Sequence, residues 1–180
     1  MKTAVFLDRD GVLNLPVLKG GQFHSPHHSD EFIILSAAKE PLRCLAQQGL
    51  ILIIVTNQPN ISRGTLQEDN LQTMHAQLVE ALGGEKVIQD VLYCPHTADF
   101  NCLCRKPKPG MLHSAARKWG ISLSDSFMIG DRDVDILAAE AAGCRSVILD
   151  YPYNPGVPCD YRATDIGDAS GWILKQMEKR

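Results

Sequence analysis

The sequence lacks long hydrophobic runs and a basic excess, and each absence excludes a class of protein. Its longest apolar run, Leu50–Val55, is far too short to span a membrane. The apolar stretch near the N-terminus is too short for a signal peptide, so we expect a cytoplasmic protein with no membrane partner. The 18 Lys+Arg and 21 Asp+Glu give a net charge of −3, which argues against binding to nucleic acid.

The sequence also lacks internal repeats, low-complexity segments and a linker. Hydrophobic residues make up 44% and charged residues 22%, an ordinary globular composition that excludes collagen, coiled coil and disorder as the main content. A chain of 180 residues is long enough for one core and short for two. We therefore expect one domain over residues 1–180, working as a monomer.

Strand and helix patterns alternate along the chain. We expect strands at Thr3–Leu7, Leu50–Val55, Val87–Tyr93, Phe127–Ile129 and Ser146–Leu149. We expect helices from Ser36 to about Gln48, from a Thr65-x-x-Glu68 capping box to about Leu82, from Pro109 to just before Gly120, over Val134–Ala142 and over Ala169–Glu178. Residues 15–30 and 150–164 are predicted to be irregular. This order predicts an α/β fold, a doubly wound parallel sheet with helices on both faces.

Polar residues follow three of the predicted strands. Asp8 and Asp10 follow the first, Thr56 and Asn57 the second, and Asp131 the fourth. The carboxyl ends of parallel strands meet at one edge, so these side chains should lie together. Asp and Gly are also common in turns, but carboxylates on two strands together favour a site for Mg²⁺. The hydroxyl and amide of the Thr-Asn pair suit phosphate oxygens, although such a pair is also common in loops.

A cluster of cysteines and one histidine lies between residues 94 and 104. Cys94, His96, Cys102 and Cys104 offer the four ligands of a closed tetrahedral Zn²⁺ site, and the alternative is a chance grouping of loop thiols. No fifth ligand and no neighbouring Glu is present to activate water, so we expect the zinc to be structural. Cys44 and Cys144 are predicted to be core residues.

Three basic residues follow this cluster directly in the sequence. Arg105, Lys106 and Lys108 precede the helix expected at Pro109, and cations near a helix N-terminus favour anion binding. A solvated charge run is the alternative. The prolines between these residues favour a positioned cluster.

Taken in order, these motifs resemble the haloacid-dehalogenase-like phosphohydrolases over essentially the whole chain. The stretches DRDGVLN from Asp8, TNQ from Thr56, CPH to CLCRKPKPGM from Cys94 and GDRDVD from Gly130 are similar to heptose bisphosphate phosphatases. Those heptose enzymes are in turn similar to the histidinol-phosphate phosphatases, which share the zinc loop, residues 94–104 in this chain.

The resemblance implies a phosphomonoesterase that removes the 7-phosphate of D-glycero-D-manno-heptose 1,7-bisphosphate. Histidinol phosphate or another small sugar phosphate is the alternative substrate. A catalytically silent zinc-loop binding module would have lost a catalytic residue, and none is lost. Transfer of the phosphoryl group to an acceptor other than water stays open.

The resemblance also implies a role for each site residue. Asp8 is the nucleophile that forms an aspartyl-phosphate, and Asp10 is the acid and base. Asp8, Asp131 and the main-chain carbonyl of Asp10 hold Mg²⁺. Thr56, Asn57 and Lys106 stabilise the phosphoryl group, and Arg105 recognises the rest of the substrate. Because Asp10 must gain and lose a proton, we expect its pKa to lie nearer neutrality than that of a free Asp.

Two segments depart from the resemblance. Pro59-Asn60 replaces a small residue and Gly, and the loop over residues 15–30 is longer and differently composed. The intervals 11–55 and 57–105 leave no room for a folded cap domain. We therefore expect an open site, shaped by loop 15–30 and the zinc loop.

Overall fold

Six parallel strands form one sheet in the computed structural model, which describes residues 1–179. The order across the sheet is β5-β4-β1-β6-β7-β8. The strands are β1 (Ala4–Leu7), β4 (Ile51–Asn57), β5 (Ile88–Cys94), β6 (Phe127–Gly130), β7 (Arg145–Leu149) and β8 (Tyr161–Ala163). All five neighbouring pairs are parallel, so the predicted doubly wound sheet is confirmed.

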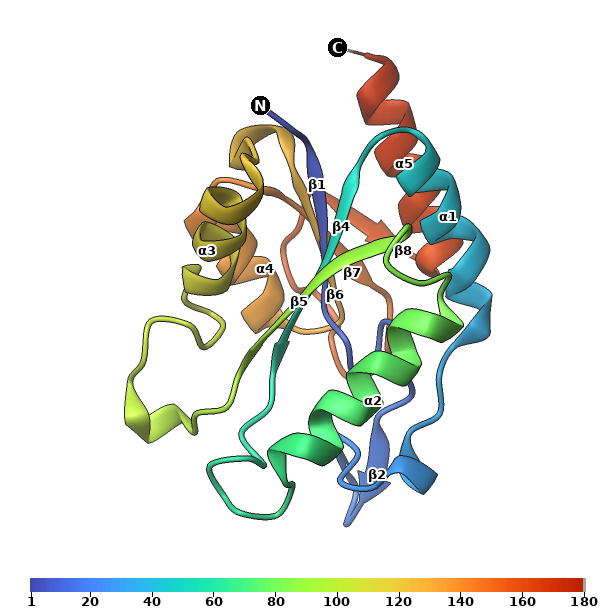
Figure 1. The fold of residues 1–180 in the computed structure, drawn as a ribbon. Coiled ribbons are helices and arrows are strands. Elements are labelled where there is room, and N and C mark those ends of the chain that lie inside the picture. Colours follow the sequence, from blue (N-terminus) through green and yellow to red (C-terminus); the bar gives the residue numbers. More distant parts are fainter. Residues whose placement is uncertain (180) are drawn as a thin grey trace.

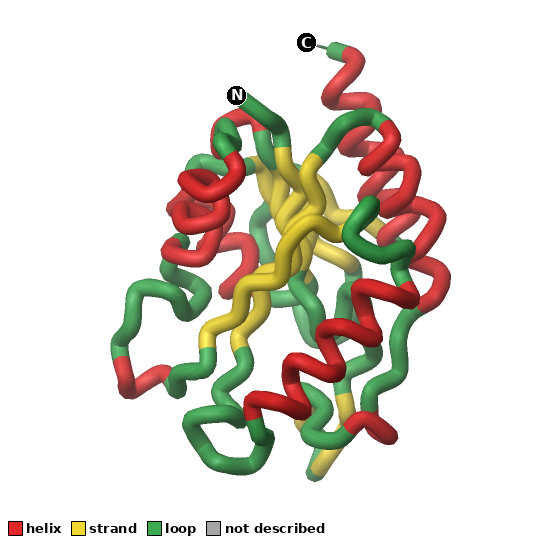
Figure 2. Tube along the Cα trace, viewed as in Figure 1, coloured by secondary structure: helices red, strands yellow, loops and turns green. Residues whose placement is uncertain are grey.

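Helices cover both faces of the sheet, as Figures 1 and 2 show. The helices are α1 (Lys39–Gln47), α2 (Glu68–Ala81), α3 (Gly110–Trp119), α4 (Asp133–Ala142) and α5 (Ile166–Glu178). Side chains alternate between the faces of each strand, so β1 sends Val5 and Leu7 into the core under α1, α2 and α5, and Ala4 and Phe6 into the core under α3 and α4. Burial on both faces explains why the strand sequences are almost wholly apolar.

Strand β1 is the point at which the chain changes direction across the sheet. Its register places Leu7 beside Ile54 of β4 and beside Ile129 of β6. The chain first builds β4 and β5 on one side and then returns to build β6, β7 and β8 on the other. In such sheets the carboxyl ends of the strands on either side of the switch form the ligand-binding crevice.

Two expected helix starts are wrong. The Thr65 capping box does not form: α2 begins at Glu68, and the Thr65 N–H instead donates to the Asn60 carbonyl at 3.0 Å. Ser36 lies in a short 3₁₀ turn, Ser36–Ala38, and α1 begins at Lys39. In both cases the residue expected to cap the helix lies instead in the turn that precedes the helix.

The two segments expected to be irregular contain structure. Residues 15–30 include an antiparallel hairpin, β2 (Val17–Lys19) and β3 (Gln22–His24). Residues 150–164 include β8, the sixth strand. Helix α5 begins at Ile166, earlier than expected, because the Asp165 carboxylate accepts from the Asp168 N–H at 2.9 Å.

The remaining expectations concern two cysteines, a cap domain and membrane-spanning segments. Cys144 is buried as predicted, but Cys44 is exposed on α1 rather than in the core. Residues 11–105 form no separate cap domain, and the crevice is bordered by the hairpin and by the loop after β5. Within residues 1–179, no helix is both long and apolar enough to cross a membrane.

Candidate functional site

The predicted polar residues meet at the carboxyl edge of the sheet, around a cavity of about 310 Å³. The cavity is lined by Asp8, Asp10, Phe23, His24, Ser25, Thr56, Asn57, Pro59, Asn60, Arg63, Arg105, Lys106, Arg132, Asp133, Val134 and Asp135. They come from the ends of β1, β4 and β6, the hairpin and the loop after β5. Segments far apart in sequence therefore share one cavity, as strand order predicts.

Three carboxylates form what we call the carboxylate cluster: Asp8, Asp131 and Asp135. Each offers an oxygen within 4.8 Å of the others, and all three residues are buried. The Lys106 ammonium lies among them, with Nζ 2.7 Å from Asp8 Oδ1 and 2.6 Å from Asp135 Oδ1. Three buried carboxyl groups face one ammonium group, so the cluster has more acidic groups than cations to pair with them.

The pKa values show the same imbalance. Burial and the neighbouring Asp135 raise the pKa of Asp8 to about 6, against the opposing effect of Lys106. Burial, Asp8 and Asp135 raise the pKa of Asp131 to about 8. Asp131 Oδ1 is buried without a hydrogen-bond partner. An unpartnered buried carboxylate oxygen beside two other carboxylates fits a hard divalent cation such as Mg²⁺.

Two glycines permit this packing. A Cβ at Gly11, whose φ is +87°, would lie 2.3 Å from Asp131 Oδ2. A Cβ at Gly130 would lie 2.2 Å from Asp135 Cβ. Both carboxylates therefore reach the cluster only because these positions have no side chain.

The Asp10 carboxylate lines the same cavity and is held by four residues that we call the donor shell: Arg9, Asn14, Ser25 and Gln58. Its Oδ1 accepts from Arg9 Nη2 and Asn14 Nδ2, both at 2.9 Å. Its Oδ2 accepts from Ser25 Oγ at 2.7 Å and Gln58 Nε2 at 3.0 Å. Burial alone would raise the pKa of Asp10, but the Arg9 charge and the Ser25 and Asn14 hydrogen bonds outweigh it and lower that pKa. Our expectation of a pKa nearer neutrality is therefore wrong here, because sequence does not reveal four donors around one carboxylate.

One member of the donor shell, Arg9, is a fully buried cation. Arg9 has no exposed surface, and its Nη1 lies 3.2 Å from Nε2 of His75 on α2. Its guanidinium also lies 5.2 Å from the centre of the Phe32 ring. Burial and Arg9 lower the pKa of His75 to about 3, with Asp10 opposing, so His75 is neutral and accepts the hydrogen bond. The donor shell is thereby anchored to α2.

Thr56 and Asn57 lie at the end of β4. The Thr56 hydroxyl accepts from Gln58 Nε2 at 2.9 Å. The Asn57 side chain pairs with the main chain of Lys106: Nδ2 donates to its carbonyl at 3.0 Å and Oδ1 accepts from its N–H at 3.1 Å. The Asn57 amide thus positions Lys106, and the predicted phosphate contacts of these residues stay predictions.

Three arginines line the cavity in addition to Lys106: Arg63, Arg105 and Arg132. Arg105 Nη1 donates to the His96 carbonyl of the zinc loop at 3.1 Å, and Arg132 Nη2 donates to the Phe23 carbonyl of the hairpin at 3.3 Å. Lys108 pairs with Asn101 instead and does not line the cavity. The cavity therefore combines carboxylates of the cluster with a basic side, which we define as Arg63, Arg105 and Arg132.

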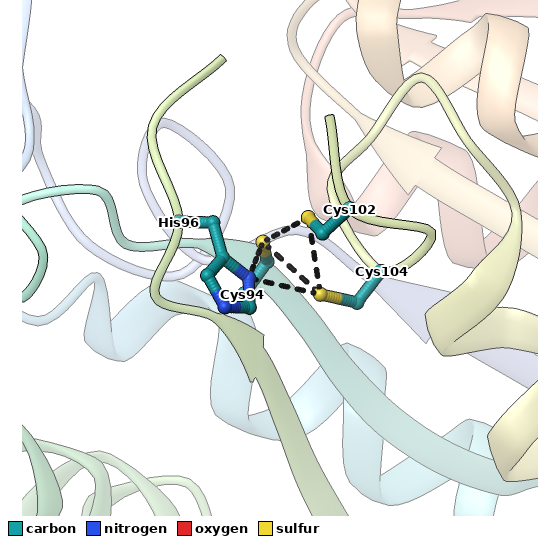
Figure 3. A group of neighbouring side chains, drawn as sticks. All are labelled: Cys94, His96, Cys102 and Cys104. Atoms are coloured by element: carbon teal, nitrogen blue, oxygen red, sulfur yellow. Dashed lines mark hydrogen bonds between the residues drawn. The ribbon is translucent and has the colours of Figure 1, made fainter. Parts of the chain in front are cut away.

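The predicted zinc ligands meet at the end of β5. Figure 3 shows the side chains of Cys94, His96, Cys102 and Cys104 pointing toward one another. Their Sγ and Nδ1 atoms lie 3.3 to 3.5 Å apart. Tetrahedral zinc with bonds of about 2.3 Å to sulfur separates its ligands by roughly 3.8 Å, so the cluster can hold zinc with small adjustments. Cys104 directly precedes Arg105, so this cluster positions the basic side of the cavity.

Sequence reasoning missed several residues of the site. Asp135 carried a usable signal, since it lies four residues after Asp131 within the GDRDVD stretch. Arg9 and Gln58 lie within the DRDGVLN and TNQ stretches, but the sequence did not indicate their hydrogen bonds to Asp10. Ser25 and His75 carried no signal, because Ser25 reaches Asp10 through the hairpin and His75 reaches Arg9 through the packing of α2. Tyr153 donates to Asp131 Oδ2 at 2.6 Å from a segment predicted to be irregular.

Comparison with known proteins gives consistent results. A family model described as HAD-hydrolase-like matches residues 103–150. D-glycero-beta-D-manno-heptose-1,7-bisphosphate 7-phosphatases of Pasteurella multocida and of Escherichia coli K12 are 36% and 32% identical. The matches cover 83% of this chain and 82% of the Pasteurella protein, and 97% of this chain and 89% of the Escherichia protein.

Solved structures show the same likeness. The D,D-heptose 1,7-bisphosphate phosphatase of B. bronchiseptica, complexed with magnesium and phosphate, superposes with a TM-score of 0.83 at 29% identity. That match covers 98% of this chain and 99% of the other. A 3-deoxy-D-manno-octulosonate 8-phosphate phosphatase of Moraxella catarrhalis, at 22% identity and a TM-score of 0.62, shares the fold.

Proposed function

We propose one reaction for this chain, which belongs to the haloacid-dehalogenase-like hydrolases: Mg²⁺-dependent removal of the 7-phosphate of D-glycero-D-manno-heptose 1,7-bisphosphate. One observation carries the proposal. The carboxylate cluster and Lys106 form a buried, cation-deficient site in a chain whose relatives are named for this reaction. The names of these relatives specify the β anomer.

Asp8 performs the first step. Its carboxylate attacks the phosphorus of the 7-phosphate, a P–O bond to Asp8 forms, and the bond to the sugar oxygen breaks. Mg²⁺ held by Asp8, Asp131, Asp135 and the Asp10 carbonyl would neutralise phosphate charge and orient the ester. Lys106 neutralises charge on Asp8 and Asp135 from 2.7 and 2.6 Å, and Thr56 and Asn57 line the phosphoryl position.

Asp10 moves the proton in both steps. It gives a proton to the departing sugar oxygen and then takes one from the water that attacks the aspartyl-phosphate. That water releases inorganic phosphate and regenerates the Asp8 carboxylate. Of the four residues in the donor shell, only Ser25 has a hydroxyl, which can turn to accept from protonated Asp10 while the N–H groups can only donate. Ser25 therefore allows Asp10 to change protonation state within the shell.

The basic side of the cavity supports a bisphosphate. Arg105, held by the zinc loop, offers a forked guanidinium to the second phosphate, and Arg63 and Arg132 add positive charge. Histidinol phosphate carries an ammonium group, which these cations would repel. The zinc bound by Cys94, His96, Cys102 and Cys104 is structural in this proposal and fixes Arg105.

We further propose one domain over residues 1–180 that works as a monomer in the cytoplasm. In support, β1, β4 and β6 of one chain supply the cluster and its neighbours. The reduced thiols of the zinc cluster also suit a reducing compartment. Light scattering of the purified protein tests the monomer.

A phosphate-release assay tests the reaction. The substrates are both anomers of the heptose 1,7-bisphosphate, the 7-monophosphate and histidinol phosphate, each with and without Mg²⁺. We expect the bisphosphate to have the highest kcat/KM and to require Mg²⁺. Arg105→Ala should lose most of the preference for bisphosphate over monophosphate, and Arg117→Ala, an exposed arginine on α3, should keep it. A preference for histidinol phosphate, or an Arg105→Ala variant that discriminates like the wild type, contradicts the proposal.

A further inference from the structure

The segment that follows β7 contacts the carboxylate cluster from outside the recognised motifs. Tyr153 Oη donates to Asp131 Oδ2 at 2.6 Å. The neighbouring Asn154 donates to the main-chain carbonyl of Asp131 at 2.6 Å and to that of Leu149 at 2.8 Å. Tyr153 therefore holds the side chain of Asp131, and Asn154 holds its main chain.

The two oxygens of the Asp131 carboxylate have different surroundings. Oδ2 accepts from Tyr153, whereas Oδ1 is buried without a partner among the described residues. Gly11 lies so close to Oδ2 that a Cβ there would clash, which restricts rotation of the carboxylate. With Oδ2 held, the remaining oxygen is the one available to a cation between Asp8, Asp131 and Asp135.

Tyr153 is itself fixed in place. Its ring stacks on Tyr151, with centroids 5.1 Å apart and an angle of 8°, and it contacts Phe23 of the hairpin at 5.0 Å. The Tyr151 hydroxyl donates to the Gly11 carbonyl at 2.9 Å. Arg162 of β8 donates to the side chain and the main chain of Asn154. A segment held at this many points can restrain a side chain instead of following it.

We infer that Tyr153 is a positioning residue that fixes the Asp131 carboxylate so that Oδ1 is directed at Mg²⁺. The inference rests on the metal site of the proposed function. Residues that hydrogen-bond to metal ligands restrict ligand orientation, and their loss typically reduces metal affinity by about 10- to 100-fold. Tyr153 does not touch the substrate in this account and acts through Asp131 alone.

The test compares Tyr153→Phe with the wild type and with Tyr161→Phe. Phenylalanine keeps the ring contacts and removes only the hydroxyl. In the control, the hydroxyl removed from Tyr161 bonds to Asp168, away from the site. The readouts are the dissociation constant of Mg²⁺ by calorimetry in the absence of substrate, and the rise in melting temperature on adding Mg²⁺.

We expect Tyr153→Phe to bind Mg²⁺ about 10- to 100-fold more weakly, with a smaller rise in melting temperature. Its kcat at saturating Mg²⁺ should approach that of the wild type, and Tyr161→Phe should bind normally. Equal or tighter binding by Tyr153→Phe overturns the inference, as does a lower melting temperature with unchanged Mg²⁺ affinity. If the wild type itself does not bind Mg²⁺, the proposed function fails as well.

Discussion

Asp8 and Asp10 are two residues apart, yet the two regions that receive them are electrostatic opposites. Asp8 enters the carboxylate cluster, where burial and the neighbouring acids raise its pKa to about 6. Asp10 enters the donor shell, where Arg9 and neutral donors outweigh burial and lower its pKa. One region has too many acceptors and suits a cation, whereas the other has enough donors to hold an anion.

The difference teaches how one loop can supply both a metal-bound nucleophile and a proton carrier. The identity of the residue does not separate the roles, since both are aspartates. The partners do, and they come from different elements: Lys106, Asp131 and Asp135 for Asp8, and Arg9, Ser25 and Gln58 for Asp10.

The largest effect should come from removing the nucleophile. Asp8→Asn keeps the size of the side chain but is a far poorer nucleophile, so we expect kcat to fall by roughly 10⁴-fold or more. The circular dichroism spectrum should not change, and the exposed Asp69→Asn on α2 should keep full activity. Substantial residual turnover by Asp8→Asn would show that the cluster is not where the phosphoryl group is transferred.

Asp10→Asn tests the other region. The amide cannot carry the proton, and it presents its own donors to the donor shell. We expect a loss of about 10²- to 10⁴-fold in kcat, larger for a sugar phosphate than for p-nitrophenyl phosphate, whose leaving group needs no proton. The free energy of unfolding should fall by about 1–3 kcal/mol, because buried donors lose their acceptor.

The matched control for this variant is again Asp69→Asn, which is exposed on α2 and does not line the cavity. It should keep both activity and stability. If Asp10→Asn loses activity equally on both substrates, Asp10 does not act as the proton donor.

A variant of the zinc cluster tests whether the positions of Arg105 and Lys106 depend on the zinc loop. Cys102→Ala removes one of four ligands, so we expect loss of the bound zinc, a lower melting temperature and weaker activity as Arg105 and Lys106 shift. Metal analysis should find about one zinc per wild-type chain, and Cys44→Ala, at an exposed thiol, should retain it. A zinc-free wild type, or a Cys102→Ala variant of unchanged stability and activity, contradicts the structural role.

The smallest effect is a pH dependence from His75. Its pKa of about 3 in the folded protein lies below the ordinary 6.5, so the unfolded chain binds more protons between these pH values. His75 therefore supports stability above pH 6.5, and that contribution decreases as the pH falls toward 3. At pH 4.5, two pH units below the ordinary value, the loss is on the order of 3 kcal/mol.

His75→Gln should lack this decrease, because glutamine can accept from Arg9 but does not titrate. Urea denaturation at pH 7 and pH 4.5 measures the difference, with His113→Gln on α3 as the control. If wild type and His75→Gln lose stability equally on acidification, His75 is not the buried neutral group described here.

Much of this arrangement could be predicted from the sequence. The strand order and the residues at strand ends place Asp8, Thr56 and Asp131 at one edge, because parallel strands share a direction. The zinc ligands are local, so their spacing alone was sufficient. The sequence also contained a signal for Asp135, namely its position four residues after Asp131 in the GDRDVD stretch.

The remaining features depend on contacts between distant segments. Ser25 reaches Asp10 through a short hairpin whose strands have only three residues each, too few to show a clear alternation. His75 reads as an ordinary polar residue on a helix, and only the packing of α2 places it beside Arg9. Tyr153 lies in a segment with three prolines, where no periodic pattern could indicate a partner.

Binding of Mg²⁺ to the zinc-loaded, substrate-free protein at pH 7 tests the contrast between the two regions most directly. With its pKa raised to about 8, Asp131 is mostly protonated before the cation arrives and must release its proton when it binds. Calorimetry in buffers of different ionisation enthalpy should find one Mg²⁺ per chain, close to one proton released, and loss of the site in Asp131→Asn but not in Asp10→Asn. Binding without proton release, or binding that survives Asp131→Asn, would contradict the account.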